Sequence, residues 1–203
     1  DCDALINTYW VRFDRGTSGH AQAVENTRQL VAAAVAAGIS RLVHVSITNP
    51  SRDSHLTYFA GKARTEEIVR SSSLSYAILR PTVLFGREDI LINNIAFLLR
   101  RVPVFLLAGT GGYRIQPVFV DDLAALAVDA VVGTDSYVID AVGSEEYSFR
   151  ELVGSIAAAI GVRRLLLPVS PALLRFTAKL LGVVLGDVLL SDPELDGLMS
   201  NLL

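Results

Sequence analysis

Tyr58 and Lys62 are the two residues whose types and spacing could together carry out a reaction. They lie four residues apart in a segment rich in helix-forming residues, and side chains at that spacing share one face of a helix. A lysine ammonium near a phenol favours the phenolate and so lowers the pKa of the tyrosine. A tyrosine of lowered pKa can act as a general acid or base at an alcohol or carbonyl carbon. The same spacing also occurs on helix surfaces that carry no chemistry, and this alternative stays open on spacing alone.

The elements that must position this pair alternate in type along the first part of the chain. Short apolar runs predict strands at 4–6, 42–45 and 75–79, and helix-forming segments predict helices at 21–37 and 58–71. An alternating order with short connections favours right-handed crossovers and a parallel sheet. The sequence therefore predicts an α/β fold, a partial Rossmann fold with a doubly wound parallel sheet.

The later part of the chain is less regular. Helices are expected at 90–101 and 121–132, and strands at 115–120 and 137–139. Ser148-Phe149-Arg150-Glu151 fits the Ser-x-x-Glu capping box, which predicts that a further helix begins there.

Composition limits the class of protein. The chain has 203 residues, of which 51% are hydrophobic and 19% charged, and its net charge is −3. This balance argues against a nucleic-acid partner, which usually requires a basic face. Cys2 is the only cysteine, so no internal disulfide can form and a reducing, cytoplasmic location is expected. No uncharged apolar stretch reaches the ~18 residues that suggest a membrane span.

The histidines and acids do not indicate a metal site. His20 and His55 have no histidine, cysteine or acid at ligand spacing. Asp121-Asp122 is interpreted as the acidic start of a helix. His44 lies inside an apolar strand and is interpreted as a core histidine with satisfied hydrogen bonds. We therefore predict no bound metal.

The glycine loop that a Rossmann domain uses to hold a pyrophosphate, G-x-G-x-x-G, has no match in the sequence. The glycine cluster Gly109-Thr110-Gly111-Gly112 precedes a predicted strand rather than a helix and is interpreted as a turn. The chain also starts without a methionine and opens almost directly into an apolar run. We therefore expect it to be a truncated chain, the later part of a longer nucleotide-binding domain.

Several stretches of the sequence resemble the short-chain dehydrogenase/reductase superfamily. In chain order they are Asn7-Thr8-Tyr9-Trp10, His44-Val45-Ser46-Ile47-Thr48-Asn49-Pro50, Tyr58-Phe59-Ala60-Gly61-Lys62-Ala63, Arg80-Pro81-Thr82-Val83-Leu84-Phe85-Gly86 and Gln116-Pro117-Val118-Phe119-Val120-Asp121-Asp122-Leu123-Ala124. The likeness is to the extended and atypical branch, with its NAD-dependent epimerase- and dehydratase-like proteins. Within that branch it lies near the group related to the NAD(P)H-binding accessory subunit of respiratory complex I. It covers nearly the whole chain and is loose after Ser170.

The resemblance implies a role for each matching residue, with NAD or NADP as the cofactor. Tyr58 would be the general acid or base, and Lys62 would hold the nicotinamide ribose and lower the pKa of Tyr58. Thr48 is taken as the third catalytic group, although the serine or threonine of the family aligns most naturally with Ile47. The other expected cofactor contacts are Asn7, Thr8, Tyr9, Ser46, Pro81, Thr82 and Val83. The expected substrate-side residues, for which an ordinary place on a strand surface stays open, are Arg114 and Gln116.

Two kinds of function follow from this resemblance. The leading hypothesis is an NAD(P)-dependent oxidoreductase or epimerase-like protein, which acts on an alcohol or carbonyl carbon of a small-molecule substrate through Tyr58 and Lys62. Because Ile47 would leave a substrate carbonyl poorly polarised, the alternative is a non-catalytic NAD(P)H-binding subunit with a structural or redox-sensing role, or an inactive fragment. The family places the residues that select NAD or NADP before Asp1, so the sequence does not predict which is preferred.

The resemblance also suggests how the chain is divided. Residues 1–145 are expected to form the C-terminal part of an NAD(P)-binding Rossmann domain with interleaved substrate-side segments, and residues 146–203 a small, mostly helical subdomain. Ser170-Pro171 and Asp192-Pro193 each place a capping residue before a proline, which is typical of a helix start. The apolar stretch 171–190 is expected to cover a substrate cleft, and docking on a membrane surface or a protein complex stays open.

The strand at 4–6 is expected to lie beside a strand that the family places before Asp1. An uncovered strand edge pairs readily with another chain. We therefore expect a homodimer, or a partner segment that covers this edge.

Overall fold

The computed structural model describes residues 2–12, 14, 19–177 and 192–200. The chain folds into two compact units, each made of two separate segments. The first unit comprises Asp1–Thr82 with Val118–Val142, and the second comprises Val83–Pro117 with Gly143–Leu203. The two units therefore alternate along the chain. The predicted division, residues 1–145 with interleaved substrate-side segments and then residues 146–203, stays a prediction.

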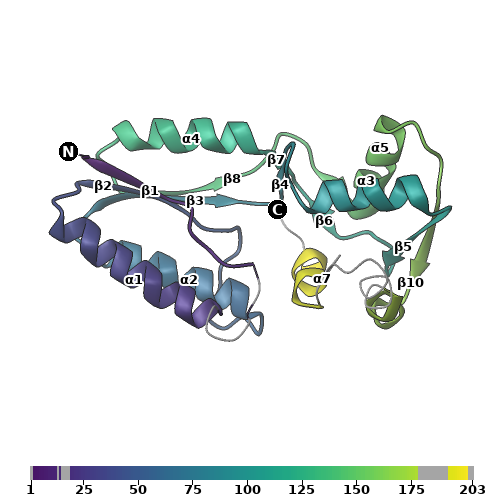
Figure 1. Ribbon diagram of the computed structural model, residues 1–203, viewed down its shortest axis with the longest axis horizontal. Helices are drawn as coiled ribbons and strands as arrows, with labels where there is room; N and C mark the ends of the chain where they lie inside the picture. The colour runs from purple at the N-terminus through teal and green to yellow at the C-terminus, as the bar shows by residue number, and fades with distance from the viewer. Residues whose placement is uncertain (1, 13, 15–18, 178–191, 201–203) are drawn as a thin grey trace. The chain divides into compact units, whose positions relative to one another are not determined.

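The first unit is a parallel sheet with helices on both faces. Its four strands run parallel in the order β1 (Ala4–Asn7), β2 (Arg41–Val45), β3 (Ser75–Pro81) and β8 (Tyr137–Ala141). Two helices cover one face and a third covers the other (Figure 1); they are α1 (His20–Ala36) and α2 (Thr57–Arg70), and then α4 (Val120–Val132). This arrangement confirms the predicted α/β fold with a doubly wound parallel sheet.

The central strand β2 shows why the first unit folds in this way. Helices cover both faces of the sheet, so successive residues of the strand are all apolar or internally bonded rather than alternating. Leu42, Val43 and His44 are fully buried. Under α1 and α2 the core gathers the apolar residues Val31, Ala34, Leu42, Val69, Leu74 and Ile78.

The ends of the helices in the first unit are fixed by particular residues. Gly38, two residues after the end of α1, has a φ of 77°, a left-handed conformation that glycine adopts without strain. Arg41 is buried and donates hydrogen bonds from Nε to the carbonyl of Ala130 at 2.9 Å and from Nη1 to that of Asp135 at 2.7 Å. A cation at the end of α4 satisfies carbonyl groups that the helix itself leaves unpaired.

Strand β1 lies at one edge of this sheet. Ile6, within that strand, is 40% exposed. This agrees with the edge position expected for the strand, while the homodimer expected from it stays a prediction.

The second unit contains two short strand pairs and several helices. β5 (Val104–Ala108) pairs in parallel with β10 (Leu165–Val169), and β6 (Arg114–Ile115) pairs antiparallel with β9 (Tyr147–Ser148). Its other elements are β4 (Leu84–Phe85), α3 (Leu91–Arg101), α5 (Phe149–Ala159), a helical stretch at 171–177 and α7 (Asp192–Met199). The capping box that starts α5 is present as predicted, with both of its reciprocal hydrogen bonds.

One expectation for the later part of the chain needs correction, and another lies partly outside the described residues. The strand predicted at 115–120 is split into β6 and β7 (Val118–Phe119), because Pro117 has no backbone N–H to donate to a continuous ladder. The stretch 171–190, expected to cover a substrate cleft, is described only as far as residue 177, so the rest of it lies outside the described residues. Within the described part of the chain, none of the helices combines the length and the apolar character needed to cross a membrane.

Candidate functional site

The carboxyl ends of β1, β2 and β3 meet at one edge of the sheet, because the three strands are parallel and adjacent. Asn7 ends β1, Ser46 follows the end of β2, and Pro81 ends β3. The backbone N–H of Ser46 donates to the carbonyl of Leu79 at 2.7 Å, and that of Thr48 donates to the carbonyl of Pro81 at 3.0 Å. The fold therefore brings these predicted cofactor residues to the edge where open α/β sheets bind ligands.

Asn7 holds the turn that follows β1. It is 2% exposed, and its side-chain oxygen accepts a hydrogen bond from the backbone N–H of Tyr9 at 3.0 Å. The phenol of Tyr9 in turn accepts a hydrogen bond from Asn26 of α1 at 2.8 Å. The carboxamide of Asn7 is thus used inside the protein, whereas Thr8 and Tyr9 are exposed. Of the three predicted contacts after β1, Thr8 and Tyr9 are the ones a ligand can reach.

His44 links Asn7 to α2 through a buried hydrogen-bond chain. Its Nδ1 accepts from the side-chain amide of Asn7 at 3.0 Å, and its Nε2 lies 3.2 Å from the hydroxyl of Thr65. The hydroxyl of Thr65 donates its hydrogen to the carbonyl of Lys62 at 2.8 Å. Its oxygen therefore accepts a hydrogen bond from Nε2 of His44, which carries the ring proton. Burial, together with the charge of Lys62, lowers the pKa of His44 to about 3. The imidazole is therefore neutral, as expected for a core histidine.

Lys62 is a buried cation on the second turn of α2. It is 3% exposed, and its Nζ donates to the carbonyl of Val45 at 3.0 Å. The same ammonium lies 4.8 Å from the centre of the Trp10 ring, within the range of a cation–π contact. Burial lowers the pKa of Lys62 to about 8, although the carboxylate of Glu66 opposes that change. Lys62 therefore carries its charge at neutral pH and loses it slightly above.

Glu66, one turn after Lys62, forms the main ion pair of the first unit. Its two oxygens accept hydrogen bonds from Nε and Nη2 of Arg80 at 2.8 and 2.7 Å, and Arg70 adds a longer contact at 3.4 Å. Burial alone would raise the pKa of Glu66, but the hydrogen bonds and the positive charge of Arg80, together with the contact of Arg70, hold it below its ordinary value. The bidentate hydrogen bonds of Arg80, which lies on β3, to Glu66 hold α2 against β3.

Three aromatic rings gather around the start of α2. The rings of Trp10 and His20 are stacked, with centroids 5.5 Å apart and planes 11° from parallel. The edge of Tyr58 meets Trp10 at 5.7 Å and His20 at 5.6 Å. Nδ1 of His20 lies 2.8 Å from the hydroxyl of Thr57. We call Trp10, His20 and Tyr58 the aromatic cluster.

The aromatic cluster was not predicted as a unit, since Trp10 and His20 carried no assigned role. Trp10 is the only tryptophan in the sequence, and it reaches α2 from the segment after β1. A signal was present in the sequence at Gly61, a glycine inside a helix. A Cβ at Gly61 would lie 2.7 Å from Cη2 of Trp10, so only glycine lets the ring approach the helix so closely.

The hydroxyl groups on either side of Ile47, those of the predicted cofactor contact Ser46 and the predicted catalytic residue Thr48, are buried. Ser46 is 4% exposed and Thr48 is 1% exposed, whereas Ile47 between them is partly exposed. The residue that faces outward at this point therefore carries an alkyl side chain. The role of Thr48 as a catalytic group stays a prediction, and its burial places its side chain away from solvent.

The remaining predicted residues are distributed over both units. Pro81 and Thr82 are buried in the first unit, and Val83 belongs to the second. In the second unit the guanidinium of Arg114 donates to Glu146 at 2.5 Å and lies 3.7 Å from Glu151. Gln116 donates to the carbonyl of Gly143 at 2.7 Å.

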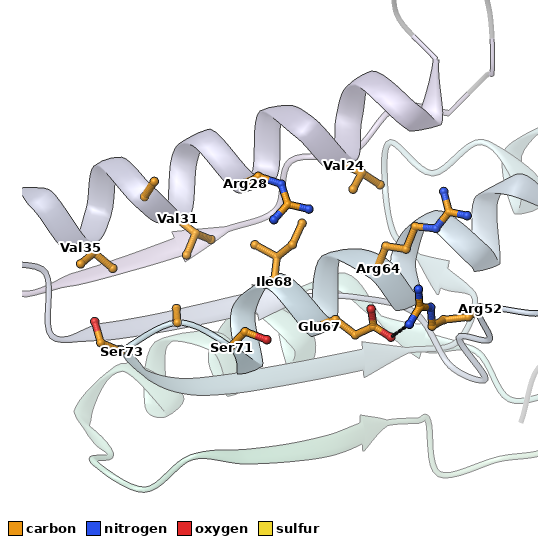
Figure 2. A pocket seen from close by; sticks show the side chains of 12 residues that line it. Val24, Arg28, Val31, Val35, Arg52, Arg64, Glu67, Ile68, Ser71 and Ser73 are labelled. Carbon is orange, nitrogen blue, oxygen red and sulfur yellow. Dashed lines mark ion pairs between the residues drawn. The ribbon is translucent and has the colours of Figure 1, made fainter.

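A groove of about 660 Å³ runs along the outer surface between α1 and α2 (Figure 2). Its apolar lining includes Val24, Val31, Val35 and Ile68, and Arg28, Arg52 and Arg64 stand along it. Arg52 pairs with Glu67 at 3.3 Å and Arg28 with Glu25 at 3.4 Å. None of the residues predicted to bind the cofactor lines this groove.

The residues at the sheet edge fit the nicotinamide and ribose part of a dinucleotide. Two buried ring nitrogens in the aromatic cluster, Nε1 of Trp10 and Nε2 of His20, have no hydrogen-bond partner among the described residues. Buried polar atoms are nearly always paired, so these two nitrogens are exceptions, and they lie beside a candidate catalytic tyrosine. A parallel sheet with helices on both faces and a Tyr-x-x-x-Lys helix beside it defines the class by its fold, a Rossmann-type α/β fold.

Comparison with known proteins supports this class. Residues 1–93 match the family model described as NAD(P)H-binding. Over 176 residues the chain is 27% identical to the NADH-ubiquinone oxidoreductase 40 kDa subunit of Neurospora crassa, covering 85% of this chain and 46% of the relative. Over 115 residues it is 36% identical to the NADH dehydrogenase 1 alpha subcomplex subunit 9 of Mus musculus, covering 54% and 29%. The chain spans less than half the length of these curated relatives.

Solved structures share the fold. The UDP-N-acetylglucosamine 4-epimerase of Bacillus cereus superposes with a TM-score of 0.71 at 20% identity, covering 84% of this chain and 66% of that one. The dTDP-glucose 4,6-dehydratase DesIV of Streptomyces venezuelae, a double mutant with NAD bound, superposes with a TM-score of 0.69 at 24% identity, covering 83% and 61%. These structures show the fold. The match of residues 1–93 to the NAD(P)H-binding model and the likeness to the Neurospora and mouse relatives bear out the predicted resemblance and the predicted cofactor class, NAD or NADP.

Proposed function

We propose that this chain binds NAD(P)H at the carboxyl edge of β1, β2 and β3, and that it holds the nucleotide without turning it over. The observation that supports the binding site is that the segment after β1, where Thr8 and Tyr9 are exposed, contacts Tyr58 and Lys62 through Trp10. Open parallel sheets bind ligands in the crevice at this edge. The family match of residues 1–93 supports the same class of ligand.

Lys62 supplies the positive charge of the proposed site. The carbonyl of Val45 takes one N–H of its ammonium, and an ammonium has three to donate. The hydroxyls of a bound ribose would accept from those that are left. Because the charged form is needed, affinity is expected to fall as the pH rises through about 8, the pKa of Lys62.

The absence of turnover is proposed from the stretch Ser46 to Thr48. A reductase must polarise the substrate carbonyl, and a hydroxyl beside the tyrosine does this by hydrogen bonding. In this chain both hydroxyl-bearing residues are buried and the partly exposed residue is Ile47. The similarity to proteins named as subunits of NADH dehydrogenase also favours an accessory, nucleotide-holding role.

A titration of the chain with NADH and with NADPH, followed by nucleotide fluorescence, tests the binding site. We expect saturable binding of at least one of them, and clearly weaker binding by the variant Lys62→Met. Arg64→Met removes a positive charge from the exposed side of the same helix and is the matched control. No saturable binding of either nucleotide would refute the proposed site in this chain.

The second candidate is an oxidoreductase or epimerase-like activity on an alcohol or carbonyl carbon. It is favoured by Tyr58, which is partly exposed one turn before a buried cation. A bound reduced nicotinamide would supply the hydride to the carbonyl carbon. Tyr58 would give its phenolic proton to the carbonyl oxygen and then regain a proton from solvent, while the charge of Lys62 stabilises the phenolate.

A panel of carbonyl substrates with NADH and NADPH separates the two candidates. Turnover that disappears in Tyr58→Phe would refute the proposal of binding without turnover. The variant Ile47→Ser returns a hydroxyl to the partly exposed position. A gain of turnover in this variant alone would support the view that Ile47 keeps the site inactive.

We further propose that this protein works as a subunit of a protein assembly. The mouse and Neurospora relatives are named as mitochondrial subunits of NADH dehydrogenases. The cytoplasmic location and the homodimer expected from the sequence are alternatives to this. Light scattering on the isolated chain at micromolar concentration would detect the homodimer, and a monomer of 21.9 kDa would count against it.

A further inference from the structure

We propose that Trp10 is a positioning residue for Lys62, and that its indole ring couples the segment after β1 to the helix that carries Tyr58 and Lys62. The inference rests on the proposed function, because its consequence is that Trp10 sets the affinity for the dinucleotide. Trp10 is not one of the residues for which the sequence predicted a role.

The first observation is the surroundings of the ammonium. Lys62 is almost completely buried, and its Nζ contacts the carbonyl of Val45 at 3.0 Å and the face of the Trp10 ring at 4.8 Å. A cation that has lost most of its water is attracted more strongly to an indole face than an exposed one. The ring therefore replaces part of the hydration that the ammonium gave up, and it limits the directions in which the ammonium can point.

The second observation is that the ring is held firmly in place. A Cβ on Gly61 would meet the ring at 2.7 and 3.0 Å, so the ring lies against the backbone of α2. The imidazole of His20 stacks on the ring and the edge of Tyr58 contacts it. The ring thus contacts Tyr58, Gly61 and Lys62 within the first turns of one helix.

The third observation concerns the chain around Trp10. Asn7, three residues earlier, holds the turn through the backbone N–H of Tyr9. The segment from Asn7 to Trp10 is thus fixed at one end by a buried amide and at the other by the indole. Its middle residues, Thr8 and Tyr9, are exposed at the proposed nucleotide site. A nucleotide that contacts this segment therefore acts on Lys62 through Trp10.

A purely structural role for Trp10 makes different predictions, and a double-mutant cycle separates the two. The variants are Trp10→Leu, Trp10→Phe, Lys62→Met and the double variant Trp10→Leu/Lys62→Met, all titrated with NADH and NADPH. We expect Trp10→Leu to weaken binding roughly tenfold and Trp10→Phe, which keeps a ring face, by no more than about threefold. In the Lys62→Met background, Trp10→Leu should have no further effect. An equal loss in both backgrounds would overturn the proposal.

A second measurement does not depend on nucleotide binding. The sequence contains two lysines, Lys62 and Lys179, so the side-chain NMR spectrum of lysine-labelled protein has one reporter and one internal reference. We expect the pKa of Lys62 to fall by about one further unit in Trp10→Leu, because the indole stabilises the charged form, and to change less in Trp10→Phe. Glu66 is the charged group that acts on this ammonium, and His44 is neutral.

The two measurements keep the two proposals apart. If the wild-type chain binds neither nucleotide, the proposed function fails, and the NMR titration still decides whether Trp10 stabilises Lys62. If the chain binds NAD(P)H but the pKa of Lys62 is the same in Trp10→Leu, the proposal for Trp10 fails alone. Should Trp10→Leu not fold by circular dichroism, Gly61→Ala displaces the ring while keeping it in the protein. That variant should then lower the pKa of Lys62, and an unchanged pKa would overturn the proposal.

Discussion

Replacing Lys62 with methionine is expected to stabilise the fold while weakening nucleotide binding. The ordinary lysine pKa of 10.5 falls to about 8 in the folded protein. One pKa unit corresponds to about 1.4 kcal/mol, so keeping this buried side chain charged near pH 7 costs about 3 kcal/mol of folding free energy. Methionine fills a similar volume without a charge, but it leaves the carbonyl of Val45 without its donor, which costs about 1 kcal/mol. The net gain expected for Lys62→Met is therefore about 2 kcal/mol.

The pH dependence gives this prediction a signature. Between pH 8 and pH 10.5 the unfolded chain holds the lysine proton and the folded chain does not. The free energy of unfolding of the wild type should therefore rise with pH across this window through Lys62, and this contribution is lost as the pH falls through about 8. The variant has no such group, so its advantage should be largest below pH 8 and should shrink towards pH 10.5.

Urea unfolding followed by circular dichroism at a series of pH values measures both quantities. Arg64→Met, which removes one positive charge from the exposed side of α2, is the matched control and should stay within about 0.5 kcal/mol of the wild type. A lower stability for Lys62→Met at pH 7, or a difference from the wild type that does not change with pH, would refute this account of Lys62.

Three other variants test separate parts of the structure. Arg80→Met should lower the free energy of unfolding by about 3 to 5 kcal/mol in urea titrations, because it leaves Glu66 charged and buried; a neutral result would mean that the pair is screened by solvent. In the wild type, the pKa of Glu66 lies below its ordinary 4.5. The contribution of the Glu66 carboxylate to the free energy of unfolding is therefore present above pH 4.5 and should be lost as the pH falls through the lowered value. Acid unfolding of Glu66→Gln, which has no such group, compared with the wild type would reveal this loss. Ser148→Ala should cost about 1 kcal/mol by removing the capping box of α5, and an unchanged thermal midpoint would contradict the role of that cap.

The first half of the fold could be predicted because its signals are local. Apolar runs, a glycine after α1 and the spacing of Tyr58 and Lys62 all lie within single elements, and the parallel sheet follows from their order. The pairing of β5 with β10 could not be predicted in this way, since the two strands are far apart in the sequence and β10 contains Pro168. A proline inside a short apolar run argues against a strand unless its partner is known.

The composition of the candidate site was predictable only in part, for a related reason. The motif identified Tyr58 and Lys62, and strand order placed Asn7 and Ser46 at the same edge. The environment of the lysine depends on Trp10, which arrives from a different element. Gly61 was visible as an unexplained glycine in a helix, but the ring that requires it appears only in three dimensions.

Helix α2 shows how the stability of this fold and its proposed function are connected. Lys62 and Glu66 lie one turn apart on α2 and both are buried. The charge of Lys62 is stabilised by the carbonyl of Val45 and the indole of Trp10, and the charge of Glu66 is stabilised by Arg80. Apolar residues in such positions often give equal or greater stability. Glu66 has a structural use, since its arginine joins α2 to β3. Lys62 lowers the stability at neutral pH, and its hydrogen bond to Val45 joins α2 to β2, which the contact between His44 and Thr65 already connects. We therefore infer that its charge serves a ligand rather than the fold.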